Sequence, residues 1–359
     1  MRAELFDRVM EGLPFLPGVL QKQAGQKEFT RSLRDYLAIA ASDERIRNGQ
    51  KMLCQHSALF DRIERDFAVE RQVVCAIWGL ETGYGAIMGD TGVLPALATL
   101  AHAGRRAEYF ESELIAALRL LQLGLCRPEQ MHGSWAGAMG HGQFMPSALL
   151  AFGVDVDGDG ACTIGGTDPA DALASVANYL AQNGWQRALP WGVEVVLPEG
   201  FDHTRAGPDQ SLTQQEWADL GVTAASGKPL PEGPGSVLLP AGANGPALLV
   251  SDNFHVILRY NRATAYAIGI GHLADRLAGG GPFVAGWPED RALASGEIRE
   301  AQRLLSRAGF GTFGADGMIG PNTIRAVRGF QAEQGLVADG YLGPVLLKAL
   351  RATVGDPAR

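Results

Sequence analysis

The feature that most constrains this fold is a change in the period of apolar residues near residue 190. Before it, apolar residues recur every three or four positions, which predicts helices over 28–40, 42–65, 68–81, 105–124 and 168–183. After it, short β-branched runs bounded by glycine and proline predict strands at VEVVLP, SVLLPAG, ALLVS and HVILRY, and a last helix spans about 264–278. The fold class is therefore mainly α, of the α+β kind, with small β-containing elements.

A stretch rich in glycine and proline at 279–291 predicts a linker. Beyond it, ADGMIGP at 315–321 recurs as ADGYLGP at 338–344, and each copy leads into an apolar helical pattern. In each copy the Asp-Gly pair suits a turn, and the proline suits the first position of a helix. We therefore expect a main domain over 1–278 and a small compact domain over 292–352.

The formal net charge of -8 and the absence of a basic stripe argue against nucleic acid and anionic membranes as partners. No window is apolar enough to predict a membrane span, and the first 30 residues lack a signal-peptide core. Cys54, Cys75, Cys126 and Cys162 form no CxxC pair, which argues against a zinc site. Disulfides and buried free thiols both remain open.

Glu81 falls on the apolar side of the helix predicted to end there, between Ile77 and Val74 on a helical wheel. Burial and the negative end of the helix dipole should both raise the pKa of its carboxyl group. A general acid needs that protonated form near neutral pH. Gly83 and Gly85 would end the helix and let a ligand approach the backbone. A glutamate that turns to solvent is the alternative.

The segment GSWAGAMGHGQFMPSALLAFG, residues 133–153, alternates small residues with large apolar ones. Its glycines would let the backbone line a groove, and its aromatic and methionine side chains offer flat apolar walls. With the polar Ser134 and Gln143, this composition suits a sugar ring. A tight helix-packing loop is the alternative.

Six motifs follow one another along the chain: IWGLETGYG at 77–85, RRAEYF at 105–110, GSWAGAMGHGQFMPS at 133–147, DVDGDG at 155–160, NYLAQNGW at 178–185 and YNRATAYA at 260–267. In this order they resemble the membrane-bound lytic transglycosylase B family, over about residues 5–278. Residues 292–352 resemble a peptidoglycan-binding module. The resemblance implies a lysozyme-like helical catalytic core and a small three-helix peptidoglycan-binding domain.

The resemblance also implies cleavage of the β-1,4 bond between N-acetylmuramic acid and N-acetylglucosamine without water. The muramic acid C6 hydroxyl attacks and leaves a 1,6-anhydro end, while one carboxyl group acts as acid and then as base. Glu81 matches that position. Conventional glycosidases use two carboxylates. Asp90 is the nearest second candidate, and a turn residue is the favoured interpretation of it.

Other residues match substrate-contacting positions of the family: Ser134, Gln143, Asn261, Tyr260, Tyr266 and Tyr179. Arg105 and Arg106 match a pair that can meet anionic parts of the wall strand. Ion pairs of these arginines with Glu108 or Glu111 are the alternative. The family usually has serine where Ala263 stands, which puts the local hydrogen bonding in doubt.

The segment DVDGDG places Asp155, Asp157 and Asp159 at positions 1, 3 and 5 of an EF-hand loop, with Gly160 at the turn position. Gly166 stands where a bidentate glutamate belongs, so the loop keeps half of the ligand set. A weak structural calcium site and a turn of solvated carboxylates are the two interpretations. No cofactor is required for the reaction.

The leading hypothesis is a periplasmic lytic transglycosylase whose partner is the glycan strand of peptidoglycan. A non-catalytic wall-binding scaffold and a hydrolytic muramidase are the alternatives. The periplasmic location follows from the substrate, since the chain as given shows no export signal. We expect a monomer, with other cell-wall enzymes as further partners.

Overall fold

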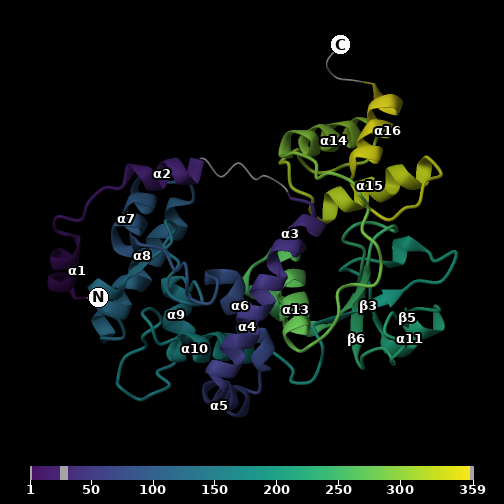
Figure 1. The fold of residues 1–359 in the computed structure, drawn as a ribbon. Coiled ribbons are helices and arrows are strands. Elements are labelled where there is room, and N and C mark those ends of the chain that lie inside the picture. Colours follow the sequence, from purple (N-terminus) through teal and green to yellow (C-terminus); the bar gives the residue numbers. More distant parts are fainter. Residues whose placement is uncertain (1, 25–30, 356–359) are drawn as a thin grey trace. The chain divides into compact units, whose positions relative to one another are not determined.

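The computed structural model describes residues 2–24 and 31–355, which fold into two compact units (Figure 1). The first, here called the helical unit, comprises Met1–Lys27, Ala40–Arg187 and Ile270–Gly280. The second, here called the sheet unit, comprises Glu28–Ile39, Ala188–Gly269 and Gly281–Arg359. Helices α3 (Leu33–Ala40) and α13 (Thr264–Leu277) begin in the sheet unit and end in the helical unit.

The helical unit consists mainly of helices, with long connections before and after α9. Its helices are α1 (Ala3–Met10), α2 (Pro17–Ala24), α4 (Asp43–Gln55), α5 (Ser57–Phe67), α6 (Arg71–Thr82), α7 (Val93–Ala103), α8 (Ala107–Leu123), the 3-10 helix η1 (Pro128–Gln130), α9 (Pro146–Phe152) and α10 (Ala170–Gln182). Two short strands, β1 (Thr91–Gly92) and β2 (His132–Gly133), pair antiparallel. The predicted mainly helical class is confirmed.

Helix α6 lies at the centre of the helical unit because almost its whole surface is apolar. Every residue from Val73 to Gly79 is buried, and α4, α5 and α10 pack against it. Burial of a large apolar side chain contributes roughly 1.5–3 kcal/mol, so the packing holds this helix firmly. The end of α6 is therefore a rigid place for a side chain such as Glu81.

Two helix predictions need adjustment. The segment predicted as one helix over 42–65 is two helices, α4 and α5, which meet at His56. Apolar residues recur with the helical period on both sides of His56, so the sequence pattern gives no sign that the helix ends there. Of the helix predicted over 28–40, residues 28–30 lie outside the described part, and α3 begins at Leu33.

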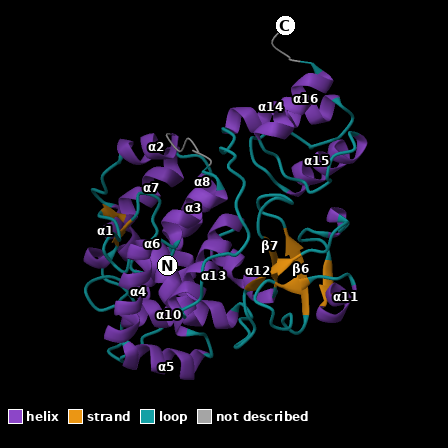
Figure 2. Cartoon of the chain, turned by 45° about the vertical axis from the view of Figure 1, so that its right-hand side comes forward, coloured by secondary structure: helices purple, strands orange, loops and turns teal. Residues whose placement is uncertain are grey.

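The sheet unit contains a five-stranded antiparallel sheet in the order β4-β6-β7-β3-β5. Its strands are β3 (Gly192–Val196), β4 (Ser211–Thr213), β5 (Thr223–Ala224), β6 (Pro234–Leu238) and β7 (Ala247–Val250). Figure 2 shows β6 and β7 side by side. The 3-10 helix η2 (His203–Arg205) and α11 (Gln214–Asp219) accompany the sheet, and buried Trp217 of α11 packs in its core. Three of the four predicted strands are thereby confirmed.

The fourth prediction, a strand at HVILRY, is wrong, because these residues belong to helix α12 (Asp252–Tyr260). Ser251 caps this helix by accepting a hydrogen bond from the backbone N–H of Asn253. Phe254, Val256 and Ile257 are buried on one helical face. Tertiary packing of that face overrides the strand propensity of the β-branched residues.

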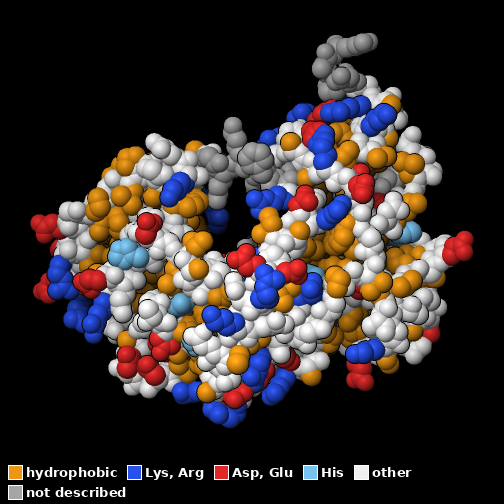
Figure 3. All heavy atoms as spheres, viewed as in Figure 1, with side chains coloured by type: hydrophobic (Ala, Val, Ile, Leu, Met, Phe, Trp, Pro, Cys, Tyr) orange, Lys and Arg blue, Asp and Glu red, His pale blue; other side chains and the backbone are white. Residues whose placement is uncertain are grey.

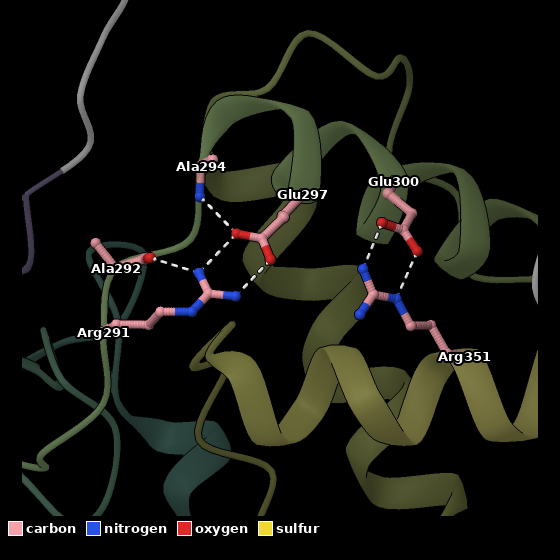
Figure 4. A network of polar contacts seen from close by, with 6 residues as sticks. All are labelled: Arg291, Ala292, Ala294, Glu297, Glu300 and Arg351. Atoms are coloured by element: carbon pink, nitrogen blue, oxygen red, sulfur yellow. Dashed lines mark hydrogen bonds and ion pairs between the residues drawn. The ribbon is translucent and has the colours of Figure 1, made fainter.

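The predicted linker is followed by three helices, α14 (Ser295–Arg307), α15 (Pro321–Glu333) and α16 (Pro344–Val354). Leu304, Val327, Phe330 and Leu350 of these helices meet in one core. Figure 4 shows two bidentate ion pairs beside that core, Arg291 with Glu297 and Arg351 with Glu300. The first pair joins the predicted linker to α14, and the second joins α16 to α14. Both arginines are exposed, so each pair adds little stability.

Basic and acidic side chains are interspersed over the face drawn in Figure 3. Within residues 2–24 and 31–355, no helix is both long enough and apolar enough to cross a membrane.

Candidate active site

Glu81 lies in the last turn of α6 and is half-buried, as the helical wheel predicts. The helix ends at Gly83, whose φ of 59° is left-handed, and the backbone N–H of Gly83 donates to the carbonyl of Gly79. Tyr84 then folds back, and its hydroxyl donates to the Arg45 carbonyl of α4 at 2.8 Å. These contacts place the Glu81 carboxyl group on a rigid helix end.

The Tyr84 ring fits between α4 and α6 because the two positions that face it are glycines. A Cβ atom on Gly79 would lie 2.6 Å from Tyr84 Cζ, and one on Gly49 would lie 2.4 Å from its hydroxyl oxygen. Any side chain at either position would push the tyrosine out from between α4 and α6. The glycines of this region therefore serve packing as well as access to the site.

The glycine-rich segment predicted to line a groove is tied to the end of α6 through His141. The indole N–H of Trp78 donates to Nδ1 of His141 at 3.0 Å, and the Thr82 hydroxyl donates to the His141 carbonyl at 3.0 Å. His141 is 4% exposed, and burial lowers its pKa. Trp78 and Thr82 flank Glu81 in sequence, so the groove segment and the acid share one anchor.

Ser134 and Gln143 hold the shape of this segment and still keep one polar atom each. Ser134 Oγ accepts the Ala138 N–H at 3.1 Å, so its own proton remains for donation. The Gln143 side-chain amide donates to the carbonyls of Met88 and Gly140, both at 3.0 Å, which leaves its oxygen as an acceptor. A hydroxyl donor and an amide acceptor together suit the hydroxyl and acetamido groups of an amino sugar.

The loop after α6 lies directly on this segment. A Cβ atom on Gly89, whose φ is 88°, would lie only 2.2 Å from the Gly133 carbonyl oxygen. A cavity of about 340 Å³ opens beside the contact and is lined in part by Met88, Gly89, Met139 and Gly140. Asp90, the second carboxylate considered from the sequence, is exposed in this loop.

The structure adds a buried carboxylate that the sequence analysis does not consider. Glu113 of α8 is 4% exposed and accepts the backbone N–H of Ser147 at 2.9 Å and its hydroxyl at 2.7 Å. Its carboxylate therefore caps the N-terminal end of α9. These hydrogen bonds give Glu113 a structural role.

The two arginines of the RRAEYF motif make neither of the ion pairs considered from the sequence within the described residues. Arg105 exchanges hydrogen bonds with Gln23, which is buried on α2. The guanidinium of Arg106 lies 4.4 Å from the centre of the Tyr109 ring, a cation–π contact. Tyr179 of α10 is half-buried against Phe152, with ring centres 4.7 Å apart.

The remaining candidates, Tyr260, Asn261 and Tyr266, belong to the sheet unit. Tyr260 ends α12 and is half-buried, and Tyr266 is 6% exposed on α13. The Asn261 side-chain oxygen accepts the Ala263 N–H at 3.1 Å in the turn before α13. That bond uses the backbone of Ala263 and so does not depend on the serine that the family usually has there.

The acidic loop brings three carboxylates close together. Among the described residues, Asp155, Asp157 and Asp159 offer carboxylate oxygens within 4.8 Å of one another, and all three residues are exposed. Backbone N–H groups, chiefly that of Gly160, hold the pKa of Asp155 below its usual range. Buried Asp171, which the sequence analysis does not consider, accepts the N–H groups of Val156 and Thr163 at 2.8 Å each and so braces both ends of the loop.

All four cysteines are free thiols. Cys54 is exposed and the other three are buried, and burial raises the pKa of Cys126 and of Cys162 to about 11. Of the two interpretations left open by the sequence, the structure has the free thiols.

A half-buried acid on a firmly packed helix end, tied to a glycine-rich segment that carries polar side chains, is an arrangement typical of enzymes that cleave glycosidic bonds. The chain belongs to the transglycosylase SLT domain family, whose model matches residues 1–275. A second model, a putative peptidoglycan binding domain, matches residues 294–350.

The comparison with known proteins agrees with this family. Over 250 residues, the chain is 34% identical to membrane-bound lytic murein transglycosylase B of Escherichia coli K12. That match covers 66% of this chain and 64% of the relative, so it spans just under two thirds of the relative's length.

Solved structures are similar as well. SltB3 from Pseudomonas aeruginosa is 45% identical, with a TM-score of 0.94, and 98% of this chain covers 95% of that one. Its crystal structures are complexes with NAG-anhNAM-pentapeptide and with NAG-NAM-pentapeptide. Lytic transglycosylase Slt35 of Escherichia coli, solved in complex with calcium, is 31% identical, with a TM-score of 0.64 and coverage of 77% and 87%. The lysozyme-like helical fold and the peptidoglycan-binding domain expected from the sequence are thereby confirmed.

Proposed function

We propose that this protein is a peptidoglycan lytic transglycosylase and that Glu81 is its general acid and then its base. The observation that carries the proposal is the half-buried Glu81 at the rigid end of α6, tied through Trp78 and Thr82 to the groove segment. Glu113, which is buried, caps α9 and so has a structural role. The proposed reaction needs one acid–base group, whereas conventional glycosidases use two carboxylates.

In the proposed reaction, Glu81 protonates the oxygen that links N-acetylmuramic acid to N-acetylglucosamine, and the bond from that oxygen to muramic acid C1 breaks. The Glu81 carboxylate then takes the proton of the muramic acid C6 hydroxyl, whose oxygen bonds to C1. The products are a 1,6-anhydro end and a free hydroxyl on the glucosamine. No water is consumed, and Glu81 returns to its acid form.

Digestion of purified peptidoglycan, followed by mass spectrometry, tests this proposal. The wild-type protein should release anhydro fragments, and Glu81→Gln should release none. Asp90→Asn removes the same charge from an exposed position in the next loop and should keep the activity. Fragments heavier by one water would instead identify a hydrolytic muramidase. Peptidoglycan binding without any product would identify a scaffold.

For the substrate we propose a glycan strand that carries peptides, of the NAG-NAM-pentapeptide kind seen with SltB3. Ser134 and Gln143 present a free hydroxyl proton and a free amide oxygen to it. Asn261, Tyr260, Tyr266 and Tyr179 complete the proposed sugar contacts on the strength of their motifs. For Arg105 and Arg106 we propose contact with anionic groups of the strand, although each also has a partner within the fold.

We further propose that residues 1–278 are catalytic, that 279–291 are a linker and that 292–352 hold the enzyme on the wall. A module that binds the same polymer raises the local concentration of substrate at the catalytic site. Because the polymer lies outside the cytoplasmic membrane, we place the protein in the periplasm. We propose a monomer that acts on the wall with other cell-wall enzymes.

For the acidic loop we propose a structural calcium ion and no cofactor requirement in catalysis. Three converging carboxylates match the oxygen ligands that calcium prefers, and the similar Slt35 was solved with calcium. Asp155, Asp157 and Asp159 would hold the ion. Without a carboxylate at position 12 of the loop, the affinity should lie at the weak end of the range for such sites.

A further inference from the structure

The small helical domain closes its first repeated loop with a clamp built on one glutamine. Gln302 of α14 donates to Asp316 Oδ1 at 2.9 Å and accepts the N–H of Gly317 at 2.9 Å. Asp316 Oδ1 also accepts the N–H of Met318 at 2.9 Å. The Arg299 side chain lies over Gly317, because a Cβ atom there would be 3.2 Å from its Nε. One carboxylate oxygen, Oδ1, is thus used inside the loop.

The second repeated loop has the same clamp, one helix further along. Gln331 of α15 donates to Asp339 Oδ1 at 2.7 Å and accepts the N–H of Gly340 at 2.8 Å. Asp339 Oδ1 accepts the N–H of Tyr341 at 2.9 Å. Arg328 lies over Gly340 with its Nε 3.0 Å from the position of a Cβ atom. The two loops therefore present the same backbone, carboxylate and arginine in the same arrangement.

In the second loop, the carboxylate oxygen that is not used inside the loop binds another segment of the same unit. Asp339 Oδ2 accepts the N–H of Ala243 at 2.9 Å, in the connection between β6 and β7. A Cβ atom on Gly242 would lie 2.7 Å from that oxygen and 2.8 Å from Tyr341 Cβ. The second loop thus holds a backbone segment of small residues. Its carboxylate accepts one N–H of that segment, and Tyr341 packs beside it.

In the first loop the equivalent surface is open. Asp316 and Arg299 are exposed, and no hydrogen bond to Asp316 Oδ2 occurs within the described residues. Met318 is 57% exposed and Ile319 is 46% exposed, whereas Leu342, the counterpart of Ile319, is 4% exposed. Hydrogen bonds from Gln302 and Met318 hold the pKa of Asp316 below its usual range, so the open oxygen is charged at neutral pH.

We propose that this first-loop surface, formed by Arg299, Asp316, Met318 and Ile319, binds the peptide of a peptidoglycan fragment. Asp316 Oδ2 accepts a backbone N–H of the peptide, as Asp339 Oδ2 accepts that of Ala243. Met318 and Ile319 cover the small side chains beside it. The occupant is a peptide because the matching loop already holds one. The choice of a wall peptide rests on the proposed function.

A titration of the isotope-labelled full-length chain followed by NMR tests the proposal, in the Glu81→Gln background so that the fragment stays intact. NAG-NAM-pentapeptide should shift the Gly317 and Met318 amide signals, and NAG-NAM without peptide should not. Asp316→Asn keeps an oxygen for the clamp and turns the open acceptor into a donor. It should weaken binding at these signals about tenfold, the size expected for a charge-assisted hydrogen bond.

Glu333→Gln is the matched control, because it removes one charge from an exposed position on the same domain and should change nothing. Asp316→Asn could also loosen the clamp. Met318→Ala tests the same surface through a side chain that is not part of the clamp, and this variant should weaken binding several-fold. Unshifted Gly317 and Met318 signals at saturating peptide fragment overturn the proposal.

Signal shifts that depend on protein concentration alone would mean that a second copy of this chain covers the surface. That result also overturns the proposal. The Ser134 and Gln143 signals report on the proposed catalytic groove independently. The failure of one proposal is therefore distinguishable from the failure of the other.

Discussion

The indole N–H of Trp78 donates to Nδ1 of His141 at 3.0 Å, and this contact determines the protonation state of the imidazole. Because Nδ1 accepts, Nε2 carries the proton and donates to the Gly166 carbonyl at 3.1 Å. The ring is neutral in the folded protein, in agreement with its lowered pKa. One buried histidine of the glycine-rich segment thereby contacts both α6 and the end of the acidic loop.

His141→Phe should destabilise the helical unit because it keeps the ring but removes both hydrogen bonds. The buried Trp78 N–H would lose its acceptor, and we expect a loss of about 2–4 kcal/mol in the free energy of unfolding. Urea denaturation measures it, with His132→Phe as control, since His132 is exposed and its replacement should cost little. Equal stability of the two variants would contradict the anchoring role.

Stability should fall as the pH drops below about 6.5, because two buried histidines are neutral in the folded state. Burial lowers the pKa of His141 and lowers that of His272 to about 4. The unfolded chain protonates both near their ordinary pKa of about 6.5, so it binds more protons than the folded state at acid pH. His272 alone should cost of the order of 3 kcal/mol by pH 4.

Urea midpoints at pH 7.5 and 4.5 measure this effect. His272→Gln should narrow the difference between the two midpoints, whereas His132→Gln, at an exposed position, should leave it unchanged. If the two urea midpoints of His272→Gln differ as much as those of the wild type, His272 does not cause the loss of stability at low pH.

Gly89→Ala should disrupt the contact between the loop after α6 and the groove segment. Its Cβ atom would meet the Gly133 carbonyl oxygen at 2.2 Å, and backbone cannot move aside as a flexible side chain can. Gly184→Ala is the control, because Gly184 also has a positive φ, of 96°, but nothing within 4 Å. We expect a loss of roughly 1 kcal/mol for the control and 2–4 kcal/mol for Gly89→Ala.

Activity on peptidoglycan should distinguish the same two variants. We expect Gly89→Ala to lose most of its activity and Gly184→Ala to keep it. Similar stability and activity of the two variants would show that the clash is relieved without moving the groove.

Calcium should raise the melting temperature of the wild-type protein through the acidic loop. At about one hundred times the dissociation constant the stabilisation is about 2.7 kcal/mol, which corresponds to a few degrees. Asp155→Asn should abolish the increment that calcium adds, and Glu199→Gln, an exposed glutamate of the sheet unit, should retain it. If 10 mM calcium, about ten times the weakest dissociation constant of such loops, gives the wild type no increment in melting temperature, the turn of solvated carboxylates is favoured.

The long helices were the elements most predictable from the sequence, because the burial pattern of a helix repeats within a few residues. The sequence located α6, α8 and α10 and three strands of the sheet, and it put Glu81 on the apolar side of a helix end. It also placed Asp155, Asp157 and Asp159 together, since two-residue spacing within a short loop leaves little freedom. Its error at HVILRY arose where local strand propensity competes with the burial of a helical face.

Contacts between residues far apart in the sequence could not be predicted in this way. His141 reaches Trp78 across 63 positions, and Glu113 is turned toward Ser147 across 34. No local period encodes such pairs, because they depend on how whole helices pack and on which buried polar groups must find partners. The sequence therefore predicts the candidate acid and its helix, whereas packing decides which distant residues anchor that helix.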